Sequence, residues 1–200
     1  MPTRVSGHGA RLFTRALMIV AAFSGASAAS AQTTISLNQP SSQVVSATIR
    51  GGTHADSNDQ WTLETRAADN LDYNRRALIK FDTENTIPKG SAVTSATLTV
   101  TVKSGSTDSS RTIAAYQTSL SWTENEVTWH QRRDGQNWQT SGGDYGSKLD
   151  TAVASNVAGS KVSFDVTALV KAAVAGTLGS RYTRIALMDV DGSSSSSYRE

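Results

Sequence analysis

Residues 97–102 read TLTVTV, so that Leu98, Val100 and Val102 alternate with three threonines. Strict alternation of apolar and polar residues is typical of a β-strand with one buried face. The same period of two recurs at residues 45–50, 62–66, 76–81, 162–166 and 185–187. Clusters of Gly, Asn, Asp and Pro separate these segments, as turns require. The pattern therefore predicts an all-β protein.

One segment has a helical period instead. Leu169, Val170, Ala173 and Val174 have helical spacing, and Gly176 follows as a stop signal. This predicts one short helix over residues 166–175. An all-β chain of 200 residues most often forms a sandwich or a barrel.

The N-terminus has the features of an export signal. Arginines precede an apolar run at residues 16–23, and the small residues that follow end in Ala29-Ser30-Ala31. A basic region, a short apolar region and an A-x-A site predict a secretory signal peptide over residues 1–31. The apolar run is too short to span a bilayer. We therefore expect a secreted, extracellular protein without a membrane span.

Processing would change the charge of the chain. The full sequence has a net charge of +2, and residues 1–31 contain three arginines and no acidic residue, so the remainder has a net charge of −1. This removes the electrostatic basis for binding nucleic acid. The absence of cysteine excludes disulfides and thiolate metal sites. We expect a polar lead segment at 32–43 and one domain at 44–200.

Two stretches carry a family signature. Residues 73–82, YNRRALIKFD, resemble an R-x-L-[I/L]-[K/R]-F-D strand, and residues 121–129, SWTENEVTW, match a W-x-E-x-x-V-T-W block. Both are similar to DNRLRE domains, which are also called carbohydrate-binding module family 96 and occur in disaggregatase-related secreted proteins. Weaker blocks with the same order lie at residues 48–56, 93–98, 164–170 and 198–200.

The resemblance implies a jelly-roll β-sandwich that is usually non-catalytic. Such modules accompany polysaccharide lyases and glycoside hydrolases, and their implied ligands are acidic polysaccharides such as alginate. A separate carbohydrate-active enzyme is therefore an expected partner. Family members continue to a further R-P-x-L-x-V strand, which this sequence lacks after Glu200. We expect its absence to leave an unpaired strand edge.

Basic residues on the predicted strands are candidate ligand-binding groups. Strand parity places them opposite the apolar residues of their own strands, and neighbouring strands would join them into one cationic stripe: Arg50, Arg66, Arg76 and Lys80. Arg199 and Tyr198 lie in the last family block and are candidates for the same stripe. Guanidinium groups bind carboxylates bidentately, which suits a uronate-rich glycan. The alternative is a solvated face in which Glu64 and Asp82 pair with these cations.

Tryptophans are a second candidate, because sugar rings stack on exposed aromatic side chains. Trp122 and Trp129 lie in a family block and are interpreted mainly as core or loop-anchoring residues. Trp61 follows a polar loop and is the better candidate for exposure. Tyr73 flanks the basic strands.

Calcium is a third candidate, because jelly-roll carbohydrate modules often hold one structural ion. Asp56, Asn58 and Asp59 offer hard oxygen ligands, and residues 189–192 offer others. Neither stretch fits an EF-hand. Asp and Asn in turns more often accept backbone hydrogen bonds.

Enzymatic functions receive less support. No G-x-S-x-G elbow occurs, and Glu124 and Glu126 lie within a structural family block. A polysaccharide lyase would need a base such as Tyr73, Tyr198 or His130. The sequence therefore predicts a non-catalytic module that binds extracellular, anionic polysaccharide. A structural or adhesive cell-surface module without a glycan site is the main alternative.

Overall fold

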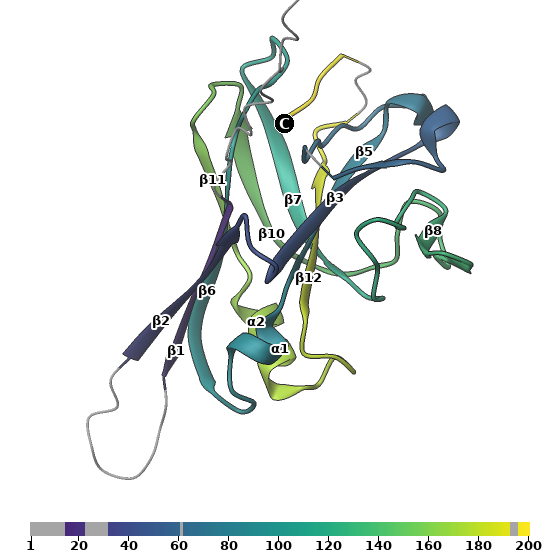
Figure 1. The fold of residues 1–200 in the computed structure, drawn as a ribbon. Helices are drawn as coiled ribbons and strands as arrows, with labels where there is room; N and C mark the ends of the chain where they lie inside the picture. The colour runs from purple at the N-terminus through teal and green to yellow at the C-terminus, as the bar shows by residue number, and fades with distance from the viewer. Residues whose placement is uncertain (1–14, 23–31, 61, 193–195) are drawn as a thin grey trace, which may run out of the picture.

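Two antiparallel sheets pack face to face, which confirms the predicted all-β sandwich (Figure 1). The computed structural model describes residues 15–22, 32–60, 62–192 and 196–200. One sheet has the order β11-β6-β1-β2, with strands Lys161–Asp165, Ala92–Thr101, Arg15–Ala22 and Gln32–Gln39. The other has the order β10-β7-β12-β5-β3-β4, with strands Tyr145–Ser155, Ser110–Thr118, Thr183–Asp189, Arg75–Phe81, Val44–Arg50 and Asn58–Asp59. The chain crosses repeatedly between the sheets, as in a jelly roll.

The space between the sheets is filled by the alternating apolar residues of both. All of the TLTVTV segment except Val102 lies in β6, where Leu98 is fully buried. Phe164 of β11 lies beside it, and Ile79, Phe81 and Ile185 approach from the six-stranded sheet. The period of two in β6 and β11 therefore reports on this shared core.

A second apolar layer covers the other face of the six-stranded sheet. Trp122, Trp129 and Trp138 are 2%, 5% and 5% exposed, so the interpretation of Trp122 and Trp129 as core residues is confirmed. They pack with Ile49 of β3 and Leu78 of β5. The layer comes from residues 119–144, which include β8 (Gln131–Arg133) and β9 (Gln136–Asn137), beyond β12 in Figure 1. We call this side of the sheet the outer face.

Helical segments lie at one end of the sandwich. The predicted helix is confirmed as α2 (Thr167–Ala175), which ends at Gly176 with a left-handed φ of 80°. A second helix, α1 (Thr83–Thr86), is short and follows β5 directly. Short 3-10 turns occur at Gly52–His54 and Leu71–Tyr73. No helix in the described ranges has the length and apolar character that a membrane crossing requires.

Some predicted elements differ from the structure. Residues 62–66 form no strand, and Thr65 and Arg66 make only isolated bridges, to Arg199 and Arg75. Strands β7 and β10 were not predicted. Residues 32–39, assigned by the sequence to a polar lead, form β2, in which Leu37 is 1% exposed.

The apolar run of the predicted signal peptide forms a strand in the uncleaved chain. Residues 15–22 are β1, between β2 and β6 in the four-stranded sheet. Removal of residues 1–31 stays a prediction, because the structure describes the chain with this segment in place.

Truncation of the shared core should reduce stability. Ile185 lies on β12, which pairs with strands on both sides, and it is fully buried. We expect Ile185→Ala to lower the free energy of unfolding by about 2–5 kcal/mol, because a cavity replaces packed methyl groups. Urea unfolding measures this effect. The control Val153→Ala, at a residue that is 66% exposed, should change it by less than about 0.5 kcal/mol. Equal effects of the two substitutions would contradict the assigned core.

Candidate functional site

Arg76 lies on the outer face between two aromatic rings. Its guanidinium carbon is 4.6 Å from the ring centroid of Trp129 and 5.3 Å from that of Tyr145. Arg76 Nη1 also donates to the carbonyl of Gly142 at 2.7 Å. This approach requires glycine, because a Cβ at Gly142 would lie 2.5 Å from the same nitrogen. Stacking and hydrogen bonding hold the guanidinium in one orientation.

Lys80 and Arg184 form a second group on the same face. They lie opposite each other in the pairing of β5 with β12, so their side chains share one side of the sheet. Lys80 Nζ is 5.1 Å from the ring centroid of Trp122 and donates to the Trp122 carbonyl at 3.2 Å. The ring of Tyr182 lies near both cations, with its centroid 5.7 Å from the Arg184 guanidinium carbon and 6.0 Å from Lys80 Nζ. We call Arg76, Lys80 and Arg184 the outer-face cluster.

Burial weakens the hydration of this second group. It lowers the pKa of Lys80, and the positive charge of Arg184 lowers it further, against the opposing effect of Glu124 and Asp82. Burial also lowers the pKa of Arg184. A partly desolvated cation gains more from an incoming anion than a fully hydrated one does.

Two buried hydrogen-bond donors belong to residues that contact or pair with Lys80. Trp122 Nε1 and Arg184 Nε are both buried, and neither has a hydrogen-bond partner among the described residues. Glu124, the nearby acid, accepts a hydrogen bond from the Ser46 backbone amide at 3.0 Å.

The cluster differs from the structural arginines in its partners. Arg111 makes a bidentate pair with Asp189, with both nitrogen–oxygen distances at 2.8 Å. Within the described ranges, Arg76, Lys80 and Arg184 make no ion pair. Carboxylates such as Glu124 and Asp82 act on Lys80 only from beyond ion-pair distance.

Arg50 and Arg66 lie on the opposite side of the sheet from Arg76 and Lys80. Arg50 is in register with Arg75, and Arg75 bridges to Arg66, so the three form a row. Successive strand residues point to opposite faces, so Arg75 and Arg76 diverge. The predicted single stripe of Arg50, Arg66, Arg76 and Lys80 therefore does not form. The reason is that the apolar residues of β3, such as Ile49, pack against the outer layer rather than between the sheets.

The positive charge of the row formed by Arg50, Arg75 and Arg66 is partly compensated by Glu64. Arg75 is 5% exposed and its Nε lies 4.0 Å from Glu64 Oε2. Burial raises the pKa of Glu64, although the charges of all three arginines oppose the shift. Arg66 stacks at 5.0 Å on Tyr73, whose side chain is 40% exposed. This row is a second, smaller place where a cation and an exposed ring meet.

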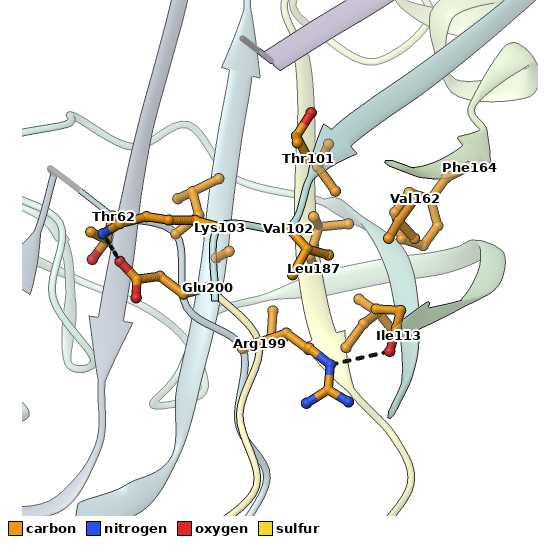
Figure 2. Close-up of a pocket in the computed structure, with 15 residues that line it drawn as sticks. Thr62, Thr101, Val102, Lys103, Ile113, Val162, Phe164, Leu187, Arg199 and Glu200 are labelled. Carbon is orange, nitrogen blue, oxygen red and sulfur yellow. Dashed lines mark hydrogen bonds and ion pairs between the residues drawn. The ribbon is translucent and has the colours of Figure 1, made fainter. Parts of the chain in front are cut away.

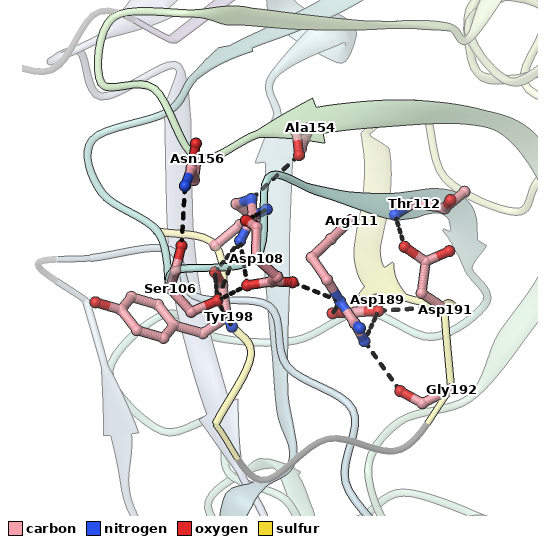
Figure 3. A network of polar contacts seen from close by, with 11 residues as sticks. Ser106, Asp108, Arg111, Thr112, Ala154, Asn156, Asp189, Asp191, Gly192 and Tyr198 are labelled. Atoms are coloured by element: carbon pink, nitrogen blue, oxygen red, sulfur yellow. Dashed lines mark hydrogen bonds and ion pairs between the residues drawn. The ribbon is translucent and has the colours of Figure 1, made fainter.

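Arg199 and Tyr198 belong to a structural network (Figure 3). Arg199 is 4% exposed, and its guanidinium donates to the carbonyl of Ala154 at 3.1 Å and to that of Asp108 at 2.8 Å. The Tyr198 amide donates to Ser106 Oγ at 3.0 Å. Arg199 is thus not on an exposed strand face, and its side chain holds the C-terminal segment to the sandwich.

A cavity of about 60 Å³ lies between the sheets beside this segment (Figure 2). Its walls include Val100, Val102, Val162 and Phe164, and Glu200 lies at its edge with its carboxylate bound to Lys103. The space is mostly apolar and has room for only about one or two water-sized groups, so it does not suit a sugar.

The calcium candidates make contacts within the protein. Asn58 Nδ2 donates to the carbonyls of Glu124 and Val127, at 2.8 and 2.7 Å. Asp59 accepts hydrogen bonds from the amide and hydroxyl of Thr62. Asp56 lies 3.0 Å from His130 Nδ1. Asn58 and Asp59 thus serve protein groups, and no group of three or more His, Cys, Asp or Glu suited to a metal occurs among the described residues. A calcium ion at this loop stays a prediction.

Sequence reasoning missed Arg184 and Tyr182. Arg184 is the second residue of β12 and Tyr182 directly precedes that strand, of which only Ile185 and Leu187 showed the period of two. Parity places Arg184 on the face opposite Ile185, but only the pairing of β12 with β5 sets it beside Lys80. Trp61, a candidate for exposure, lies outside the described residues.

Comparison with known proteins agrees with the sequence resemblance. The model of carbohydrate-binding module family 96 matches residues 38–182. The match spans β3, β5 and the outer layer of residues 119–144, which carry Arg76, Lys80 and their tryptophan partners. It ends before β12, which carries Arg184. A search of curated proteins found no match to the chain.

The burial of Lys80 gives a stability prediction. Because its folded pKa lies below the ordinary value of 10.5, the unfolded chain binds more protons between those two values. The free energy of unfolding should therefore gain a rising contribution from Lys80 as pH increases through that window. Lys80→Met should lack it and should change stability by only about 1 kcal/mol at pH 7, because relief of desolvation offsets the lost hydrogen bond.

Urea unfolding of both proteins from pH 7 to pH 10.5 measures the contribution. The stability of the native chain relative to Lys80→Met should increase across the range. Parallel curves would show that Lys80 is hydrated like a surface lysine.

Proposed function

This chain belongs to carbohydrate-binding module family 96, and we propose that it binds an anionic, uronate-rich polysaccharide through the outer-face cluster. The carrying observation is that Arg76, Lys80 and Arg184 contact aromatic rings without making ion pairs in the described structure. Such cations keep their charge available for carboxylates.

The chemistry of the cluster suits a charged sugar in two ways. Carboxylates would accept hydrogen bonds from Lys80 and Arg184, which lie opposite each other on the same side of the sheet. Tyr182 is half-buried beside both cations and offers a ring on which the apolar face of a pyranose stacks. Contacts at a half-exposed face are screened by salt, so the affinity at one site is modest and a polymer gains by offering many sites.

The proposed role is non-catalytic and extracellular. Export follows from the predicted signal peptide, and a separate carbohydrate-active enzyme is the expected partner. His130, a candidate base for a lyase, is hydrogen-bonded to Asp56. A role as a binding module therefore uses the cluster without requiring a catalytic base.

Affinity electrophoresis tests the proposal. The full chain should be retarded by alginate or pectate in the gel, and the retardation should fade at high salt. The double variant Lys80→Met, Arg184→Met should bind at least about tenfold more weakly, because each lost charge-assisted hydrogen bond is worth roughly 1.5–3 kcal/mol. The matched control Arg50→Met, Arg66→Met removes the same charge from the other side of the sheet and should bind within about twofold of the native chain.

Three results would contradict the proposal. Loss of binding in the control pair alone would move the site to Arg66 and Tyr73. Retardation by neutral glucans at any salt concentration would mean that rings rather than charges select the ligand. A chain that is folded by circular dichroism and retarded by no glycan would be a structural or adhesive module.

A further inference from the structure

Strand β1 occupies an interior position in its sheet. Its residues are in register with Gln32–Gln39 of β2 on one side and with Ala92–Thr99 of β6 on the other. β2 and β6 are not paired with each other, so their connection in the sheet depends on β1. We call the position between β2 and β6 the β1 slot.

The occupant of the slot is the segment that the sequence assigns to a cleaved leader. Cleavage after Ala31 would separate β1 from β2 and would leave the exported chain without a covalent strand at this position. Neighbouring strands lie about 4.8 Å apart. Without β1, the axes of β2 and β6 would therefore be separated by two such spacings, roughly 9.6 Å, which leaves room for one strand.

Contacts beyond the slot hold β2 in place. Gln32 Nε2 donates to Thr94 Oγ1 of β6 at 3.2 Å, at one end of β2. At the other end, Gln39 Nε2 donates to the Val44 carbonyl of β3 at 3.2 Å. Leu37, between these ends, is buried in the shared core. The contact of Gln39 with β3 and the burial of Leu37 oppose a shift of β2 onto β6, and the Gln32 side chain reaches β6 across the slot.

The register defines the chemistry that the slot selects. The position held by Leu17 lies between Leu37 and Leu98, which are 1% and 0% exposed. The position held by Ile19 lies between Ile35 and Ala96. Alternate positions of the occupant therefore need apolar side chains.

The intervening positions have polar neighbours. The position of Met18 lies between Ser36 and Thr97, and that of Val20 lies between Thr34 and Ser95. An apolar leader matches the slot at every second residue only. A strand that alternates apolar and polar residues would match it on both faces.

The chain continues past Thr99, the last residue of β6 that is in register with β1. Val100 and Val102 follow and line the cavity between the sheets. Further on, Arg199 pairs with Gly105 in an antiparallel bridge, the direction that β1 also takes along β6. The Lys103 and Ser104 amides that follow β6 already donate to the Glu200 carbonyl, so the C-terminal segment limits the length of the slot.

We propose that the β1 slot is a strand-acceptor site, which in the exported protein takes an extended segment of a partner polypeptide. The segment is about eight residues long, runs antiparallel to β6, and has apolar side chains at every second position with polar ones between. Main-chain hydrogen bonds to both neighbours supply affinity, and the apolar positions supply specificity. The proposal rests on the predicted cleavage and is independent of glycan binding.

Strand exchange in the full chain tests this site. A site-specific protease sequence is inserted between residues 26 and 27, and the folded protein is cleaved there. The probe is a fluorescent peptide of residues 15–22 with Met18→Thr and Val20→Thr. We expect size-exclusion chromatography to show that the cleaved protein retains the probe and releases its own N-terminal fragment. The uncleaved protein should retain little probe, because its tethered strand has an effective concentration in the millimolar range.

A second peptide provides the matched control. With Leu17→Asp and Ile19→Asp added to the probe, retention should fall at least about tenfold, because charges would enter an apolar interior. Equal retention of both peptides would contradict the proposal, as would a cleaved protein that stays folded and retains neither. If loss of the fragment unfolds the chain, the probe should restore its circular dichroism spectrum, and failure to do so would also contradict it. Mass spectrometry of exported protein tests the premise, which fails if residues 1–31 are still attached.

Discussion

Burial of the six-stranded sheet on both faces is the constraint on which the rest of the structure depends. In β5, Ile79 faces the other sheet while Leu78 faces the tryptophan layer, and both are fully buried. Few positions on this sheet remain for charged groups. Arg76 and Lys80 occupy two of them, and each is accommodated by stacking on a ring of the layer that covers its neighbours. The outer layer thus both completes a second core and positions the cations.

The same constraint separates two kinds of cation. Where an arginine is fully enclosed, as Arg111 and Arg199 are, acids or carbonyls satisfy it, because an unpaired buried charge is strongly unfavourable. At the margin of the outer layer, cations are only partly desolvated and contact aromatic rings. An anion that reaches them meets cations that are not in ion pairs within the described structure, although Glu124 and Asp82 act on Lys80 from a greater distance. This difference in local environment, rather than net charge, distinguishes a candidate binding face from the structural network.

The sequence predicted the sandwich because most strands alternate cleanly, as TLTVT in β6 does. It missed β7, in which Ile113, Ala114 and Ala115 are consecutive buried residues, because burial on both faces removes the period of two. It missed β10, whose pairing with β7 has register shifts near Lys148. The orientation of Arg50 was unpredictable for a related reason. Period two tells which residues share a face, but it does not tell which layer that face meets.

Chemical-shift mapping by NMR tests the central claim most directly. The full chain, labelled with nitrogen-15, would be titrated with a short uronate oligosaccharide at low salt. We expect the largest shifts at Lys80, Arg184, Tyr182 and the indole N–H of Trp122, with little change at Arg66 or Tyr73. Shifts centred on Arg66 and Tyr73, or shifts confined to the exposed loops, would contradict the assignment of the binding face.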